Sequence, residues 1–217
     1  MTADNGTHGR PRLLDLFCGA GGAAMGYHRA GFDVVGVDIV PQPHYPFEFV
    51  QADWADGVAN LLDQANVIHA SPPCQGYSRM RHLPWLAHKQ YERLIDAVWE
   101  ALRLTGRPWV IENVEDAPMP HSTVLCGQIF GLPMYRHRRF GSSHLIMAPP
   151  HEQHRQVISA GRMLGDHGRV SSWERAIRLP QAMGCDWMTQ KEVSQAIPPA
   201  YTEYIGAQLI DAIRAAA

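Results

Sequence analysis

RLLDLFCGAGG, residues 12–22, runs from a short apolar segment into a glycine-rich turn. The segment Arg12–Phe17 predicts a buried β-strand, and Ala23–Ala30 predicts a helix that ends at Gly31. Because glycine has no side chain, such a turn allows a ligand to approach the backbone closely. A strand that passes through a glycine turn into a helix is the first unit of a βαβ fold.

The same alternation of strand and helix patterns continues as far as Ile111. Strands are expected at Val34–Ile39, Phe49–Ala52, Asn66–Ala70 and Trp109–Ile111, and helices at Val58–Gln64 and His88–Leu104. This alternation predicts an α/β fold with a doubly wound, mostly parallel sheet.

The pattern is less regular after Pro118. Strands are expected at Val124–Phe130 and Phe140–Leu145, and helices at Ser172–Met183 and Pro199–Ala215. Residues 146–172 are rich in Pro, His, Gly and Ser, which predicts a loop or a small irregular insertion.

Composition narrows the class of protein. The length of 217 residues favours one domain, and a hydrophobic content of 46% suffices for a sizeable core. The chain has no apolar run long enough to cross a membrane, and its polar N-terminus lacks the apolar stretch of a signal peptide. We therefore expect a cytoplasmic protein. A net charge of −2 argues against a basic protein that coats DNA.

Arginine supplies almost all of the positive charge, with 17 Arg against 2 Lys. The segment from Met134 to Arg178 has eight Arg and only three acidic residues. A GC-rich genome produces such a bias without any function, and the arginines would then lie on an ordinary solvated surface. The alternative is a surface that faces phosphate, because guanidinium groups match phosphate oxygens.

The cysteines and histidines do not predict a metal site. Cys18, Cys74, Cys126 and Cys185 are far apart and form no CxxC pair, which argues against a zinc knuckle. His151 and His154 have a loose ligand spacing, but no cysteine and a single acid, Glu152, lie near them in the sequence. We expect surface histidines in a loop, and no bound metal.

Acidic residues end the second and third expected strands. Asp38 follows Asp15 by 23 residues, a spacing that suits a carboxylate accepting hydrogen bonds from ribose hydroxyls. Asp53 could accept a hydrogen bond from an adenine amine. Because ligands of doubly wound sheets bind at the carboxyl ends of strands, the glycine turn and these two acids predict an adenosine-type ligand. The turn is not GxGxxG, and no phosphate-binding P-loop motif is present.

Two further motifs follow the fourth and fifth expected strands. SPPCQGYS, residues 71–78, places Cys74 between a rigid proline pair and a glycine, and Glu112 follows the apolar run before Asn113 and Val114. Cys74 could be a thiolate nucleophile, or simply a small apolar residue in a loop. A partly buried Glu112 would have a raised pKa and could donate a proton to a substrate, or it could merely cap a loop.

DLFCGAGG, PPCQGYS and ENV, in this order and spacing, resemble the S-adenosylmethionine-dependent cytosine-5 DNA methyltransferases. The resemblance is good from Leu13 to about Val114 and weaker through Arg136–Phe140 and Ala182–Tyr204. It implies a Rossmann-like methyltransferase fold and a methyl transfer to carbon 5 of cytosine. Cys74 would add to carbon 6, Glu112 would hold N3, and Asn113 would orient the nearby loops.

The resemblance also assigns the remaining site residues. The family has Gln-x-Arg-x-Arg where this chain has Met134 and then Arg136 and Arg138. We expect Arg138 to hold the cytosine carbonyl with support from Arg136, although a solvated basic strand edge is the alternative. The cofactor S-adenosylmethionine, which becomes S-adenosylhomocysteine, would be bound by Phe17, Cys18, Gly19, Gly21, Gly22, Asp38, Ile39, Asp53, Trp54, Pro72, Gln195 and Ile197.

Gln195 stands where the family has Asn, so this side chain departs from the family pattern at that cofactor contact. The resemblance implies one catalytic domain over residues 1–217. It would consist of a cofactor and catalytic core at 12–114, a short substrate-recognition insertion at 141–172, and a C-terminal segment at 173–217 that packs back on the core.

The short insertion leaves the substrate open, because family members that read a DNA sequence carry a much longer region there. Residues 141–172 cannot form a domain with its own core, although Arg155, Arg162 and Arg169 could hold phosphates. We expect cytosine-containing DNA as substrate, in a phage or restriction–modification setting. The alternatives are a free cytosine nucleotide, RNA (since a tRNA enzyme shares the motifs), and a non-catalytic relative that binds nucleic acid.

Overall fold

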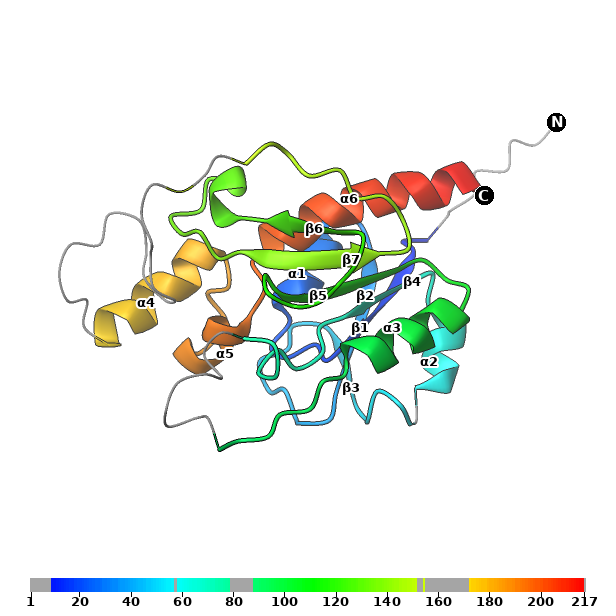
Figure 1. Cartoon of the computed structure of the whole chain (residues 1–217), viewed down its shortest axis with the longest axis horizontal. Helices are drawn as coiled ribbons and strands as arrows, with labels where there is room; N and C mark the ends of the chain where they lie inside the picture. The colour runs from blue at the N-terminus through cyan, green and yellow to red at the C-terminus, as the bar shows by residue number, and fades with distance from the viewer. Residues whose placement is uncertain (1–8, 57, 79–87, 152–153, 155–171, 217) are drawn as a thin grey trace.

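A seven-stranded sheet forms the centre of the computed structural model, which describes residues 9–56, 58–78, 88–151, 154 and 172–216. The strand order is β3-β2-β1-β4-β5-β7-β6 (Figure 1). The strands are β1 (Arg12–Leu16), β2 (Asp33–Asp38), β3 (Glu48–Gln51), β4 (Val67–Ala70), β5 (Trp109–Val114), β6 (Ser122–Leu125) and β7 (Arg138–Ser142).

The pairing directions divide this sheet into two parts. Strands β1 to β5 pair with one another in parallel, whereas β7 runs antiparallel to both β5 and β6. The order reverses between β1 and β4, because the chain moves outward from β1 to β3 and then returns to the other side of β1. The prediction of a doubly wound, mostly parallel α/β sheet is confirmed, and ligands of such folds bind at this reversal.

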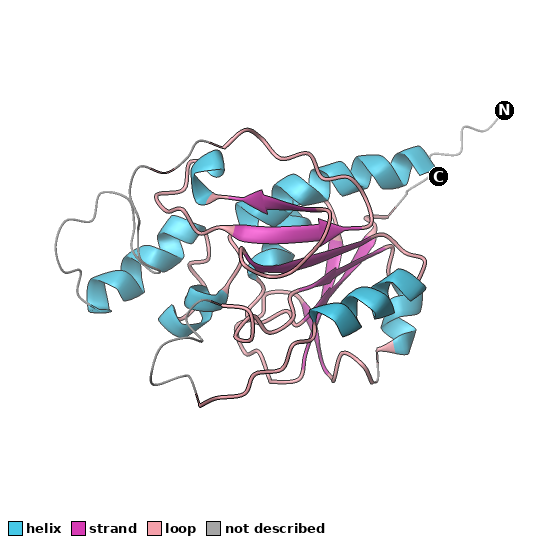
Figure 2. Ribbon diagram, in the orientation of Figure 1, coloured by secondary structure: helices cyan, strands magenta, loops and turns pink. Residues whose placement is uncertain are grey.

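Helices cover both faces of the sheet (Figure 2). They are α1 (Gly22–Ala30), α2 (Ala59–Gln64), α3 (Ile95–Leu104), α4 (Ser172–Met183), α5 (Gln190–Gln195) and α6 (Pro199–Ala216). In β1, Leu13 packs with α1 and α6, while Leu14 and Leu16 pack with α3 on the other face. This division follows from the two-residue alternation of side chains along a strand.

Helices α1 and α6 lie side by side although they come from opposite ends of the chain (Figure 1). The contact requires glycine at Gly26, because a Cβ there would lie 2.1 Å from the carbonyl oxygen of Pro199. Thr202 reinforces the contact by donating a hydrogen bond to the carbonyl of Ala23 at 2.8 Å. No helix among the described residues is long and apolar enough to span a membrane.

Three details differ from the sequence predictions. The helix expected at His88–Leu104 begins only at Ile95, whose backbone N–H donates to the hydroxyl of Tyr77. The strand expected at Val124–Phe130 ends at Leu125, and Gly127–Phe130 forms a 3-10 helix instead. Helix α5 was not expected, although Thr189 and Glu192 form the capping box that marks a helix start.

Candidate active site

The candidate site lies where the parallel strands end. A pocket at this edge is lined by Phe17, Val37, Asp38, Ile39, Ala52, Asp53, Trp54, Pro73, Glu92 and Leu94. Five of the residues predicted to bind the cofactor are among them: Phe17, Asp38, Ile39, Asp53 and Trp54. Glu92 and Leu94 were missed, because the sequence pattern placed them inside a helix and gave no sign that they reach a pocket.

Asp38 fixes the turn after β1 and still has acceptor capacity for a ligand. Its carboxylate accepts hydrogen bonds from the backbone N–H groups of Gly19 and Val40, both at 3.0 Å. A carboxylate has about four lone-pair sites, so two further bonds from ribose hydroxyls fit this group. Ile39 next to it is 63% exposed, which places an apolar side chain at the pocket rim.

The glycine turn leaves open space beside the backbone. Apart from its chain neighbours, no heavy atom of the described residues lies within 4 Å of the position that a Cβ on Gly19 would take, and the residue has a φ of +49°. Phe17 before it also has a positive φ, of 57°, and its ring lies 5.7 Å from that of Trp54. The open backbone, the aromatic pair and the carboxylate suit an adenosine-type cofactor with an attached aliphatic chain.

The other predicted cofactor residues lie around this edge in different roles. A Cβ on Gly22 would lie 2.5 Å from the carbonyl oxygen of Ile197, so the C-terminal segment passes directly over the turn. Ile197 itself belongs to the core, Gln195 is exposed, and Cys18 is buried. Gly21 packs against Tyr45 and Pro46. Pro72 is buried, and it is Pro73 that lines the pocket.

Cys74, Glu112 and Arg138 form a cluster at the ends of β4, β5 and the start of β7. Arg138 Nε lies 3.0 Å from Glu112 Oε1, and both side chains are largely buried. Burial raises the pKa of the Cys74 thiol, and the nearby Glu112 raises it further, while the guanidinium of Arg138 lowers it. The structure thus brings together the three residues that the motifs assigned to the chemistry.

Burial also raises the pKa of Glu112, although Arg138 and a hydrogen bond from Ser71 oppose the shift. A carboxyl group whose pKa is raised keeps its proton to higher pH and can donate it. The Glu112 side chain therefore has the environment of a proton-donating acid, in a cluster that also contains a thiol.

Asn113 connects the two motifs. Its side-chain Nδ2 donates to the carbonyl of Pro72 at 2.9 Å, and its Oδ1 accepts from the N–H of Val114. Both contacts are buried or partly buried, so the loop that carries Cys74 is held against the end of β5. Asn113 thus joins the loop of Cys74 to the strand of Glu112.

Arg136 contacts the C-terminal segment. Its guanidinium donates to the carbonyls of Ser194 and Ala196, and the hydroxyl of Tyr201 donates to its backbone carbonyl. Burial and the neighbouring Arg138 lower the pKa of Arg136 to about 9. Its partners show that Arg136 fastens residues 194–196 beside the site, while Arg138 is the arginine that contacts Glu112.

A buried hydrogen-bond chain behind Glu112 was missed by the sequence analysis. His69 lies 3.0 Å from the hydroxyl of Tyr27 and 2.8 Å from the hydroxyl of Ser71. Burial lowers the pKa of His69 to about 3, so its ring is neutral. Ser71 in turn bonds to Glu112, which links the carboxyl group to the interior. A polar residue in the apolar strand VIHA was the available signal.

Four potential metal ligands meet at a separate place, beside the start of β7. Cys126 Sγ lies 3.4 Å from His154 Nε2, and the rings of His137 and His151 lie next to the same nitrogen. The expectation that no cysteine lies near His151 and His154 is therefore wrong for the folded chain. Cys126 is distant only in sequence. Arg155, Arg162 and Arg169, expected to hold phosphates, lie outside the described residues.

The sequence matches known methyltransferases. Residues 12–117 match the family model of C-5 cytosine-specific DNA methylases. The chain is also 25% identical over 258 residues to a protein of Oceanobacillus iheyensis whose name assigns it provisionally to the type II methyltransferases. That match covers 89% of this chain and 55% of the relative, so the chain spans about half of that protein's length.

Solved structures share the fold across nearly the whole chain. The S. pombe Dnmt2 methyltransferase has a TM-score of 0.58 at 14% identity, covering 94% of this chain and 99% of that one. The Entamoeba histolytica methyltransferase EhMeth has a TM-score of 0.56 at 13% identity, covering 95% and 98%. Residues 12–117, just under half of the chain, are thus similar to the C-5 cytosine-specific DNA methylase family, and the solved structures show that the fold is shared.

Proposed function

We propose that this protein transfers a methyl group from S-adenosylmethionine to carbon 5 of cytosine in DNA. The observation that carries the proposal is the cluster of Cys74, Glu112 and Arg138, beside a pocket lined by Asp38 and Asp53. A nucleophile, an acid and a cation meet at the edge of the sheet where ligands of doubly wound folds bind. The description of the family and the type II name of the relative support DNA as the substrate.

The chemistry begins with Cys74. Its thiolate adds to carbon 6 of cytosine and forms a sulfur–carbon bond, while Glu112 donates a proton or hydrogen bond to N3. The addition turns carbon 5 into the nucleophilic end of an enamine. After carbon 5 has accepted the methyl group, a base removes its proton, the carbon 5–carbon 6 double bond re-forms, and Cys74 leaves as thiolate.

The cofactor supplies an electrophilic methyl group on a sulfonium when it is bound. Asp38 would accept hydrogen bonds from its ribose hydroxyls, Asp53 would face the adenine, and Ile39 and Trp54 would cover the base with apolar surface. The space beside Gly19 would leave room for its aliphatic chain close to the backbone.

Arg138 acts on the substrate side of the cluster. A guanidinium beside Glu112 can hold the cytosine carbonyl and stabilise the negative charge that develops on it during the addition. Its positive charge also favours the thiolate form of Cys74, since it lowers the pKa of that thiol. Arg136 supports this arrangement indirectly, because its guanidinium donates hydrogen bonds to the backbone carbonyls of Ser194 and Ala196.

A target base in a duplex must leave the stack to reach Cys74. In this proposal residues 1–217 form one catalytic domain with a core at 12–114. Residues 141–172 act as a small recognition insertion, and 173–217 pack back on the core. So short an insertion favours contacts to phosphates and a short or relaxed target sequence. The type II name of the relative favours a restriction–modification role.

A substrate panel tests the proposal. Purified protein is incubated with methyl-labelled S-adenosylmethionine and, separately, with duplex DNA, single-stranded DNA, tRNA, dCMP and CMP. The matched control is the Cys74→Ser variant. We expect label in duplex DNA, recovered as 5-methylcytosine and absent with the variant. Label only in a nucleotide or only in tRNA would contradict the DNA assignment, and label that persists in the variant would contradict the role of Cys74.

A further inference from the structure

The strand register explains why a cysteine, a histidine and a carboxylate meet at the start of β7. Leu125 of β6 and Val114 of β5 both pair with Arg138, one on each side of β7. The residues one step beyond these pairs are Cys126, His137 and Glu115. These residues flank the ends of three neighbouring strands, so they lie side by side, although 22 residues separate Glu115 from His137 in the sequence.

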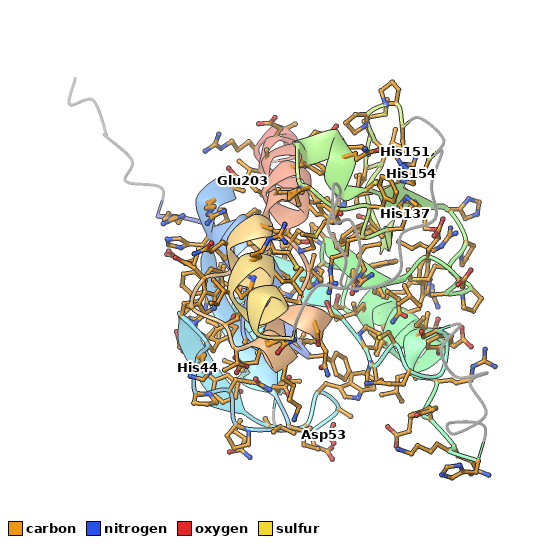
Figure 3. The ribbon with its side chains drawn as sticks, turned by 90° about the vertical axis from the view of Figure 1, so that its left-hand side faces the viewer. His44, Asp53, His137, His151, His154 and Glu203 are labelled. Atoms are coloured by element: carbon orange, nitrogen blue, oxygen red, sulfur yellow. The ribbon has the colours of Figure 1, made fainter. Side chains whose placement is uncertain are left out.

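The loop after β7 brings two more histidines to these residues. Met147 in that loop is tied to α6, because its N–H donates to Gln208 Oε1 at 2.9 Å and its carbonyl accepts from the hydroxyl of Tyr204. From there the chain returns to His151 and His154. Figure 3 shows His137, His151 and His154 gathered together on the opposite side of the molecule from Asp53, so the cluster is separate from the cofactor pocket.

The four side chains point their donor atoms at one another. His154 Nε2 lies 3.0 Å from His137 Nε2, 3.1 Å from His151 Nε2 and 3.4 Å from Cys126 Sγ. All four donor atoms lie within 4.8 Å of one another. The ring of His154 also stacks on that of Tyr135, with 3.4 Å between centroids, which fixes its orientation.

Hydrogen bonds within the cluster cannot satisfy these atoms. His137 Nδ1 lies 3.0 Å from Glu115 Oε2 and can donate its proton to that carboxylate, while Nε2 faces the cluster. His154 Nε2 carries either one proton or one lone pair, yet it has three close neighbours. One proton or one lone pair cannot be aligned with three neighbours at once, so hydrogen bonding leaves part of this cluster poorly satisfied. A cation among the four atoms would bind all of the lone pairs at once.

We propose that Cys126, His137, His151 and His154 bind one zinc ion in a closed, structural site. A tetrahedral zinc ion with ligand bonds of about 2.0–2.3 Å places its nitrogen ligands roughly 3.4 Å apart and nitrogen and sulfur roughly 3.6 Å apart. The contacts of 3.0, 3.1 and 3.4 Å are close to these values. One sulfur and three nitrogen ligands are a set that suits zinc and leaves no open position for a substrate.

Glu115 supports the proposed site through a hydrogen bond to His137, without being a metal ligand itself. Metal-bound histidines commonly donate their second ring N–H to a carboxylate, which fixes the ring and strengthens it as a ligand. The bond between His137 and Glu115 has this form. Two positive charges of zinc, one thiolate and the Glu115 carboxylate sum to zero, so the partly buried site needs no further counter-ion.

The location gives the metal a positioning role. His137 directly precedes Arg138, whose guanidinium contacts Glu112, and His154 directly precedes residues 155–171 of the predicted recognition insertion. A zinc ion would tie β6, β7 and the return loop together. An insertion too short for its own core gains stability from such a metal, as small metal-bound domains do. The metal site stands independently of the methyl-transfer proposal.

Metal content is the first measurement. The full-length protein, expressed with zinc present and dialysed, is analysed by inductively coupled plasma mass spectrometry. We expect about one zinc per chain, as for a four-ligand structural site. Replacement by Co²⁺ should give intense tetrahedral d–d bands and a thiolate-to-cobalt charge-transfer band. Protein with no bound zinc and no such bands would overturn the proposal, whatever its methyltransferase activity.

Variants then assign the ligands. Cys126→Ser should abolish the charge-transfer band, and His151→Ala should lower bound zinc at least tenfold. His151 is exposed, so its removal leaves the core intact. The matched controls are Cys74→Ser and His144→Ala, a cysteine and a histidine outside the cluster, and both should keep their zinc and cobalt bands. Loss in the controls, or zinc retained in both ligand variants, would contradict the assignment.

Discussion

The two parts of the sheet carry their chemistry in different ways. Along the parallel strands, each functional group lies within a few residues of a strand end, as Asp38, Cys74 and Glu112 do. At the antiparallel strand β7, the cluster draws on residues 126, 137, 151 and 154, from three separate segments. Parallel strands gather short motifs at one edge, whereas antiparallel pairing joins residues that no short motif connects.

The largest expected effect is a loss of methyl transfer at the parallel part of the sheet that leaves the metal site at β7 unchanged. Cys74→Ser should reduce methyl transfer by at least about a thousandfold, because a hydroxyl is a far weaker nucleophile than a thiolate at neutral pH. Steady-state assays with duplex DNA measure the loss. The melting temperature and the zinc content should stay those of the wild type. A variant that lost its zinc would show that the two parts are not independent.

Glu112→Gln should reduce kcat by about 10²- to 10⁴-fold, the usual contribution of a positioned acid. Burial raises the pKa of Glu112, so the wild-type rate should fall at high pH as this group loses its proton. Burial and Glu112 raise the pKa of Cys74, so the rate should rise with pH on the acid side. A pH–rate profile of the variant should lose the alkaline fall, and a retained fall would assign it to another group.

Asp38→Asn should weaken cofactor binding by about 10- to 100-fold, the range for hydrogen bonds to a charged acceptor. Isothermal titration calorimetry with S-adenosylhomocysteine measures the change. Because Asp38 also accepts from Gly19 and Val40, the variant should lose some stability as well. Asp63→Asn, at an acidic residue outside the described pocket lining, is the matched control and should bind normally.

The smallest effect concerns Asp15, which is fully buried and has no hydrogen-bond partner for either carboxyl oxygen among the described residues. Burial raises its folded-state pKa well above the unfolded value. Its contribution is therefore fully present below the unfolded pKa and is lost as pH rises toward the folded pKa. Relative to Asp15→Asn, the wild type should therefore lose stability as the pH rises from 4 to 8. Urea denaturation measures the free energy of unfolding of both proteins at both pH values. A difference between the two proteins that does not change with pH would contradict the prediction.

The sequence predicted the parallel part well, because buried strands, glycine turns and strand-end acids each leave a local pattern. Asp38, Asp53 and Trp54 do line one pocket, and Cys74 and Glu112 do lie beside Arg138. Several of the failures have a common cause. Helix α3 starts late, and His69 and the Cys126 cluster were missed, because each depends on contacts between segments distant in sequence. Helix α5 is the exception, because its capping box is a local signal.

The most direct test of the central claim traps the covalent intermediate. Duplex DNA with 5-fluorocytosine at every cytosine of one strand is incubated with the protein and S-adenosylmethionine. Because fluorine at carbon 5 cannot leave as a proton does, the enzyme should remain bonded to the base. We predict a protein–DNA adduct by intact mass analysis, mapped to Cys74 and absent in Cys74→Ser. Methylation of ordinary DNA without any adduct, or an adduct that forms equally in the variant, would contradict the account.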